Sequence, residues 1–340
     1  MPSARGFSVS CYKHAKSLPD NVFNALEENR VDANVILPFL KKGTNERSNS
    51  YPSFSSEQLW VCCVNYTGKV EIVLSCTTNV IGGYPIFIVS AQPVSLWKRD
   101  SLEARLLRLA EALVKSVPVD RVYSVFAPDT IVKLFSQQWS KLTNIPVTHC
   151  YYEARLLSCT AATLTSSSST SSVFGISRPV VAADLHDIAR ICLQFSEESE
   201  PFVLNSQNAM KEAEYLVSRN YAWVHCVDVW TNGKCKSEVA CIAAFTRNTA
   251  EIATISKVYT DPHWRSRGFA KTLVRKVSEY LLRDTGRQKV VLYVAHANES
   301  AARVYESVGF VEPDASVQSG HSLNWTELGF DKSQVTLGHW

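Results

Sequence analysis

The chain has 340 residues, of which 46% are hydrophobic and 20% are charged, and its 35 Lys and Arg against 32 Asp and Glu give a formal net charge of +3. This composition is that of a soluble globular protein with about two domains, and it excludes a disordered chain. The small net charge gives no support for a nucleic-acid partner or an anionic membrane surface.

Neither the N-terminal segment nor any later run has the features of an export signal or a membrane span. Residues 1–20 lack the apolar core of a signal peptide, and no apolar run approaches the roughly 20 residues that a membrane helix needs. The ten cysteines are scattered, with only Cys62 and Cys63 adjacent and no C-x-x-C pair, which favours free thiols in a reducing compartment. We expect a cytoplasmic protein without a metal site, and the nucleus stays open as a location.

The first half, residues 1–163, predicts an α/β domain. Its short apolar runs are separated by turn signals such as Thr67-Gly68, and its helical segments place leucines three and four residues apart. The expected elements, in order, are two short helices within residues 20–42, strands at Leu59–Asn65, Val70–Cys76 and Tyr84–Ser90, a helix through Leu102–Leu113, a strand at Arg121–Phe126, a helix from Pro128 or Asp129, and a strand at Val147–Cys159.

A serine- and threonine-rich run at residues 164–172 predicts a flexible linker, and residues 173–340 predict a second domain. The expected elements there are a strand at Phe174–Val181, a helix through Phe195, a polar turn at Ser196–Pro201, a helix at Ser206–Ser218, and strands at Ala222–Trp230, Glu238–Thr246 and Ile252–Thr260, followed by the stretch described next. A last strand at Leu323–Leu328 is expected beside Phe310–Glu312.

The stretch from Ile252 to Phe310 carries the most specific pattern. After the strand, a short loop at Arg265–Ala270 opens directly into an amphipathic helix. The N-terminus of a helix offers unpaired N–H groups and the positive end of the helix dipole, so this loop is suited to hold a pyrophosphate. Gly268 allows a close approach of the backbone, and Arg265 and Arg267 add cationic donors.

A second strand, Lys289–Ala295, leads to a helix that Asn298 caps at its start and Gly309 at its end, with Tyr305 on its apolar face. The order of strand, R-x-x-G-x-A loop, helix, strand and N-x-x-A-x-x-x-Y-x-x-x-G-F helix resembles the acetyl-CoA site of the GNAT superfamily of N-acetyltransferases. The resemblance extends more loosely over about residues 173–330.

The resemblance implies the GNAT fold: a mixed, mostly antiparallel sheet flanked by helices in an α/β (α+β) protein. Because the element order of the first half matches that of the second, we expect two tandem GNAT-like domains. Residues 91–101 of the first half, AQPVSLWKRDS, contain neither the loop motif nor a glycine. The first half is thus expected to be a degenerate copy without a pyrophosphate site; an unrelated α/β domain is the alternative.

The resemblance also implies which residues meet the cofactor, acetyl-CoA. Irregular alternation within Ile252–Thr260 fits a bulge near residues 256–258, where GNAT proteins splay this strand from the next. A plain central strand, a basic surface turn and a simple helix cap are the structural alternatives for these motifs. The implied cofactor-binding residues are Val258, Tyr259, Thr260, Arg265, Ser266, Arg267, Gly268, Phe269, Ala270 and Asn298.

Tyr305 is the candidate catalytic residue, since a phenol can donate a proton to the departing thiolate. Its alternative is a core aromatic. The general base stays open, because the strand Ile252–Thr260 has no carboxylate and Thr254 stands near the position of the glutamate of the histone acetyltransferase branch. The acidic turn offers Glu197 and Glu198 as substrate-binding residues. The remaining base candidates are Glu200, His225, Glu251, His296 and a water chain.

These residues predict transfer of an acetyl group from acetyl-CoA to a primary amine, which makes the chain an acyltransferase. A small or amino-acid-like acceptor is slightly favoured over a protein lysine or N-terminus, because the acidic turn would attract a cationic amine. A protein that binds acyl-CoA without catalysis, and transfer of a longer acyl chain, stay open. The sequence does not fix an oligomeric state.

Overall fold

The computed structural model describes residues 6–44, 58–166, 174–313 and 324–339. The chain forms two compact units: unit 1 comprises residues 1–156 and 313–340, and unit 2 comprises residues 157–312. The expected linker falls within unit 2, and its residues 167–172 lie outside the described residues. In the part of the chain that the structure describes, no helix has the length and the apolar run needed to cross a membrane.

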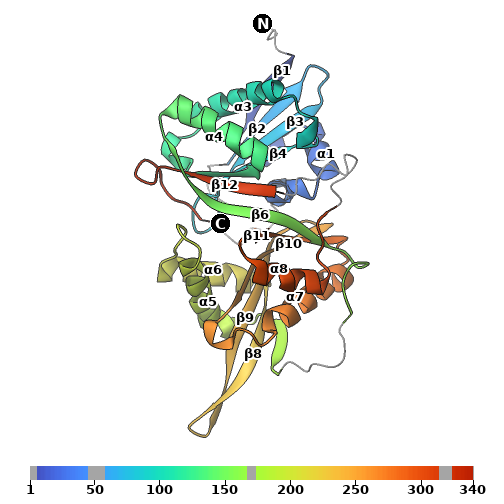
Figure 1. Ribbon diagram of the computed structural model, residues 1–340, viewed down its shortest axis with the longest axis vertical. Coiled ribbons are helices and arrows are strands. Elements are labelled where there is room, and N and C mark those ends of the chain that lie inside the picture. The colour runs from blue at the N-terminus through green and yellow to red at the C-terminus, as the bar shows by residue number, and fades with distance from the viewer. Residues whose placement is uncertain (1–5, 45–57, 167–173, 314–323, 340) are drawn as a thin grey trace. The chain divides into compact units, whose positions relative to one another are not determined.

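Unit 1 is built on a sheet with the strand order β1-β2-β3-β4-β5-β12-β6 (Figure 1). Neighbouring strands are antiparallel except β4 and β5, which are parallel. The strands are β1 (Phe7–Tyr12), β2 (Leu59–Asn65), β3 (Val70–Cys76), β4 (Ile86–Ser90), β5 (Ser124–Pro128), β6 (Val147–Cys159) and β12 (Asn324–Phe330), and the helices are α1 (Asp20–Glu28), α2 (Leu37–Thr44), α3 (Arg99–Val114) and α4 (Asp129–Thr143).

The predicted order of elements in the first half is confirmed, with one strand missed. The leucines at three- and four-residue spacing in α3 lie in the unit 1 core, together with Phe135 and Trp139 of α4. The missed strand is β1, which pairs with β2 although only Phe7 of its six residues is buried. A strand with one buried side chain shows no alternation of apolar residues, so its sequence carried no signal.

The last strand was predicted correctly, but the partner predicted for it was wrong. The strand itself exists as β12, but it pairs with β5 and β6 of unit 1, where Trp325 and Phe330 are fully buried. It does not lie beside Phe310–Glu312; Val311 instead forms a bridge with Ser158. Alternating side chains mark a strand but not the sheet that receives it, and that choice depends on which sheet has a vacant position.

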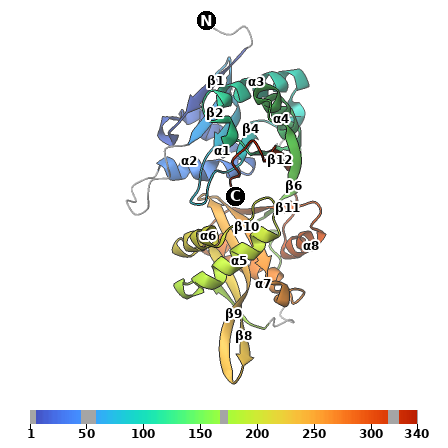
Figure 2. The same cartoon turned by 90° about the vertical axis from the view of Figure 1, so that its left-hand side faces the viewer.

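Unit 2 has the strand order β11-β10-β9-β8-β7, with α5 and α6 on one face of the sheet and α7 and α8 on the other (Figures 1 and 2). The strands are β7 (Ile176–Pro179), β8 (Ala222–Thr231), β9 (Lys234–Asn248), β10 (Ile252–Thr260) and β11 (Lys289–Ala295), and the helices are α5 (Leu185–Glu197), α6 (Ser206–Ser218), α7 (Phe269–Glu279) and α8 (Glu299–Val308).

The two units share one order of elements: a strand, two helices, three strands, a helix, a strand and a helix. This confirms the predicted duplication and the fold class, a mixed and mostly antiparallel sheet flanked by helices. In unit 2 the apolar face of α7 packs on the sheet through Leu273, Val274 and Val277, which are fully buried. The amphipathic pattern therefore fixed which face of α7 turns inward.

A buried ion pair lies on the opposite face of the unit 2 sheet. The ammonium of Lys257 on β10 is 2.7 Å from Oε1 of Glu212 on α6, and the side chains are 7% and 15% exposed. Burial by itself lowers the pKa of Lys257, but its contacts with Cys192 and Glu212 raise the pKa above the ordinary value. The charged pair therefore ties α6 to the middle of β10.

Candidate functional site

Strand β10 carries the bulge that the sequence predicts. Its pairing with β9 passes from Ile255 opposite Phe245 to Lys257 opposite Ala244, so Ser256 is an extra residue on β10. A second irregularity leaves Thr246 extra on β9, and its hydroxyl donates to Ser256 Oγ at 3.0 Å. The two extra residues thus bond each other within the pairing of β9 and β10.

Beyond this bulge, β10 separates from β11. The parallel pairing of the two strands covers Ile252 to Thr254 against Lys289 to Val291, yet β10 continues to Thr260 and β11 to Ala295. Main-chain groups of β10 between the bulge and Thr260 therefore lie along an edge that β11 does not cover. Val258 and Thr260 are half-buried on this segment. The prediction of a splayed strand, against a plain central strand, is confirmed.

The loop after β10 turns its backbone through two left-handed residues. Ser266 has φ = 62° and Gly268 has φ = 78°, with Arg267 between them. Such alternation turns successive N–H groups towards one side, which makes a concave site for an anion. Gly268 is the N-cap of α7 and provides no side chain to bond the first N–H groups of that helix. The backbone fits a pyrophosphate, and the first N–H groups of α7, those of Phe269 and Ala270, have no side-chain cap.

The two arginines of the loop have different surroundings. Arg265 donates from Nε to the carbonyl of Thr260 and from Nη2 to Glu198. Arg267 instead lies over the rings of Trp264 and Phe174, with its guanidinium carbon 5.1 and 5.9 Å from the ring centroids. Within the described residues Arg267 has no hydrogen bond or ion pair, so it is the arginine whose N–H groups remain free to meet an anion.

Asn298 and Tyr305 occupy the expected positions on α8. Asn298 is exposed and caps the helix through Oδ1, which accepts from the N–H of Ala301 at 3.0 Å. The helix-cap role is thus present, and the amide NH₂ group remains for a ligand. Tyr305 is 9% exposed, and its ring packs on Phe310.

The phenol of Tyr305 stays protonated in this environment. Burial, and then the neighbouring Cys241, raises the pKa of Tyr305 well above the usual value of a phenol. Cys241 in turn accepts a hydrogen bond from the hydroxyl of Thr260 at 3.2 Å, on the splayed part of β10. Tyr305 and Thr260 therefore share a neighbour at the separation of the strands. A phenol whose pKa exceeds that of a thiol acts by donating a hydrogen bond to the thiolate.

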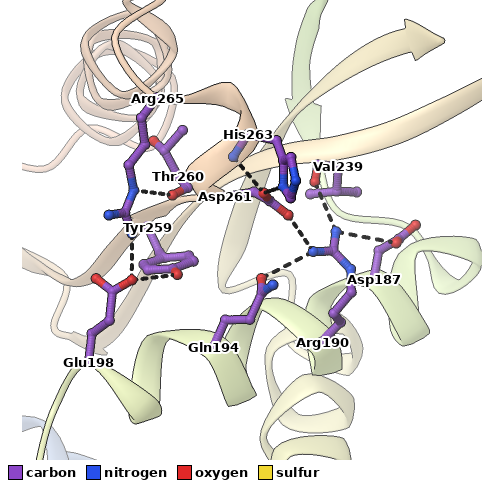
Figure 3. A network of polar contacts seen from close by, with 10 residues as sticks. All are labelled: Asp187, Arg190, Gln194, Glu198, Val239, Tyr259, Thr260, Asp261, His263 and Arg265. Atoms are coloured by element: carbon purple, nitrogen blue, oxygen red, sulfur yellow. Dashed lines mark hydrogen bonds and ion pairs between the residues drawn. The ribbon is translucent and has the colours of Figure 1, made fainter.

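The acidic segment at the end of α5 makes hydrogen bonds to Arg265 in the loop Arg265–Ala270 and to Tyr259 before it. Oε1 of Glu198 accepts from the hydroxyl of Tyr259 at 2.9 Å and from Arg265 at 2.6 Å (Figure 3). Burial and then this bond raise the pKa of Tyr259 to about 12. Glu197 is exposed beside it. The structure thus brings together Glu198, predicted for the acceptor, and Arg265, predicted for the cofactor.

The other base candidates differ in access. Thr254 and His225 are buried, and His225 donates from Nε2 to the carbonyl of Phe174 while Ser177 Oγ lies 2.8 Å from Nδ1. These bonds occupy both ring nitrogens, and burial lowers the pKa of His225. His296 is exposed after β11, and Glu251 precedes β10 at the end far from the loop. Of the remaining base candidates, His296 and Glu200 present exposed side chains.

One group of polar residues escaped the sequence-based prediction. Arg190 of α5 donates to Asp261 at 2.6 Å and to the carbonyl of Val239 at 3.3 Å, and Asp261 caps the turn before the loop by accepting from His263 N–H. The available signal was a polar stripe at helical spacing along α5, formed by Asp187, Arg190, Gln194 and Glu198.

A hollow of about 400 Å³ adjoins this group of polar residues and is lined by Asp187, Arg190, Lys236, Glu238, Asp261, His263 and Trp264. It contains no residue of the splayed edge of β10 or of α8. Among the described residues, no cluster of three or more His, Cys, Asp or Glu side chains is placed to hold a metal.

The corresponding segment of unit 1 has a different backbone. β4 and β5 also pair over a short range, Ile86 and Phe87 against Val125 and Phe126. Residues 91–99, all of them described, contain no positive φ angle. The indole of Trp97 donates to Ser90 Oγ at 3.0 Å, within the connection from β4 to α3. Unit 1 keeps the framework but lacks the alternating left-handed residues that turn N–H groups towards an anion.

Comparison with known proteins agrees with this geometry. Residues 182–310 match the model of the acetyltransferase (GNAT) family. The chain is 35% identical over 85 residues to an uncharacterised N-acetyltransferase of Methanocaldococcus jannaschii, a match that covers 24% of this chain and 37% of that protein. The chain thus spans little more than a third of the length of this curated relative.

Solved structures match over nearly the whole chain. A GCN5-related N-acetyltransferase from Sphaerobacter thermophilus is 12% identical with a TM-score of 0.52, covering 98% of each chain. A tandem GNAT protein from the clavulanic acid biosynthesis pathway is 11% identical with a TM-score of 0.50, covering 95% of this chain and 97% of that one. At these identities the matches show the fold alone, and that fold is the tandem arrangement expected from the sequence.

Proposed function

We propose that unit 2, whose residues 182–310 form a domain of the acetyltransferase (GNAT) family, transfers the acetyl group of acetyl-CoA to a primary amine. The observation that carries this proposal is the splayed edge of β10 running into a loop with two left-handed residues at the uncapped start of α7. An extended thiol arm fits the edge, and a pyrophosphate fits the loop.

Most of the predicted cofactor residues have a task in this proposal. Main-chain N–H groups of Val258 and Thr260 hold the arm and the acetyl oxygen, where they would stabilise developing negative charge. The N–H groups of residues 266–270 and the guanidinium of Arg267 hold the pyrophosphate, and the amide of Asn298 contacts the arm. Bound acetyl-CoA supplies the thioester. Tyr305 donates a hydrogen bond to the thiolate as it departs.

The acceptor enters from the side of the turn after α5. The exposed carboxylate of Glu197 attracts a cationic amine, and Glu198 completes the acidic surface while it holds Arg265. These charges support a small or amino-acid-like amine as the acceptor. The amine must lose a proton before it attacks, and water or the exposed His296 receives that proton.

A thiol-release assay tests the function directly. Purified protein is given acetyl-CoA with amines, amino acids, polyamines and lysine peptides in turn, and free CoA is measured. We expect release above background with at least one small amine. Binding of acetyl-CoA without release across the whole panel would instead support a protein that binds acyl-CoA without catalysis.

The variant Gly268→Asp tests the loop. A side chain in the left-handed region costs about 1 kcal/mol and here also places a carboxylate where the pyrophosphate would lie, so we expect loss of acetyl-CoA binding by calorimetry. Gly286→Asp is the matched control, because Gly286 also has a positive φ, 71°, with open space around it, and it lies beyond the other end of α7. Unchanged binding in Gly268→Asp would disprove the loop assignment.

A further inference from the structure

Helix α5 holds the end of β10 at two points two turns apart. Near its middle, Arg190 bonds Asp261, which caps the turn Pro262–Trp264. At its C-terminal end, Glu198 bonds both Tyr259 and Arg265. Figure 3 shows the two contacts rising from the same side of α5 to the segment that runs from Tyr259 to Arg265.

The contact at Glu198 fixes the first residue of the loop. Arg265 immediately precedes Ser266, the first left-handed residue, and its guanidinium is held by three groups at once: Glu198, the carbonyl of Thr260 and the face of Tyr259 at 5.3 Å. The side chains of Arg265 and Glu198 are 46% and 52% exposed, so these contacts and not burial hold the guanidinium. A guanidinium with these partners orients the backbone from which the N–H groups of the loop are directed.

Glu198 itself lies where the acceptor amine is proposed to enter. It is the C-cap of α5, directly after the exposed Glu197 that ends the helix, and it continues into the turn that carries the exposed Glu200. Any shift of the loop when it closes on an anion is therefore transmitted through Arg265 to this turn, and any shift of the turn returns to the loop. Such coupling is reciprocal in binding free energy.

We propose that Glu198 is a positioning residue. Through Arg265 it couples the loop Arg265–Ala270, which is proposed to bind the cofactor, to the turn Ser196–Pro201, where the acceptor is proposed to enter. The inference rests on the proposed function, because it assumes that the loop binds CoA. It assigns Arg265 to the coupling and leaves Arg267 as the side chain that meets the pyrophosphate.

The test is a double-mutant cycle on CoA affinity with the full chain. Isothermal titration with CoA is carried out on the wild type, Glu198→Gln, Arg265→Gln and the double variant. We expect each single change to raise Kd about fivefold, the lower end of usual coupling, and the double variant to raise it no further than either alone. Glu214→Gln, an exposed charge on α6, is the matched control and should bind as the wild type does.

Hydrogen exchange gives the readout that a purely structural role would not affect. In the wild type, CoA should slow exchange in residues 265–272 and also in residues 196–205, and in Glu198→Gln the second effect should disappear. Wild-type affinity in Glu198→Gln, tighter binding there, or additive effects in the double variant would each overturn the coupling while leaving the proposed function intact. Absence of CoA binding by the wild type would instead refute both.

Discussion

At the scale of single residues, the site depends on side chains whose surroundings set their chemistry. Tyr305, the predicted catalytic residue, is buried against Phe310 and beside Cys241. Burial raises its pKa, which in the proposed reaction favours a hydrogen bond to the thiolate over full proton transfer. Arg265 and Arg267 are two residues apart in the sequence, yet one is held by a carboxylate and the other lies on aromatic rings.

Replacing Tyr305 with Phe should separate catalysis from binding. The change removes the donor and keeps the ring that packs on Phe310, so we expect thiol release to fall about 10²-fold while the Kd for acetyl-CoA stays constant. Initial rates and titrations on the same samples measure the two effects. If the rate is unchanged, Tyr305 is only a core aromatic.

The buried pair of Lys257 and Glu212 should be important for stability. Lys257→Met leaves the carboxylate of Glu212 without its ammonium, and we expect a loss of about 3–5 kcal/mol in the free energy of unfolding. The double variant Lys257→Met/Glu212→Leu should recover most of it, since both charges are then gone. Urea unfolding of the three proteins provides the comparison, and equal stability of single and double variants would contradict the expectation.

At the scale of elements, the features that make a segment a helix or a strand differ from those that decide its partners in the fold. The sequence patterns of α7, α8 and β10 marked these elements, and those of α8 and β10 also marked both ends, because the apolar spacing and the caps are local features. The partner of β12 and the bonds between α5 and the loop depend on residues far apart in the sequence, which no local pattern encodes.

The place of β12 in unit 1 makes a prediction about stability. Trp325→Ala removes a fully buried side chain that packs on Phe126, and should cost about 3–5 kcal/mol. Hydrogen exchange should then accelerate in β5 and β6 and stay constant in β8 and β9. Phe310→Ala, at a fully buried position in unit 2, should show the opposite distribution. Uniform acceleration in Trp325→Ala would show that the units do not unfold separately.

At the scale of the whole molecule, two units of one fold differ in one connection. Residues 265–268 of unit 2 include two left-handed positions, and residues 91–99 of unit 1 include none. An anion needs N–H groups turned to one side, so the shared fold does not imply a shared ligand.

The chain should therefore bind one CoA. Titration calorimetry is expected to give a stoichiometry near one per chain, and native mass spectrometry should give the same count. Gly268→Asp should remove all specific binding and should not halve it. A second CoA that remains in this variant would place a site in unit 1 and contradict the argument from its backbone.

The duplication, the loop at the start of α7, the bulge and the caps of α8 follow from the sequence, because the elements that reveal them are marked by residues within a few positions of one another. Three outcomes became visible only in three dimensions: where β12 pairs, which arginine of the loop is held, and that Glu198 at the end of α5 holds it. Those outcomes depend on contacts between residues tens to hundreds of positions apart, where distance in space is set by packing and not by spacing along the chain.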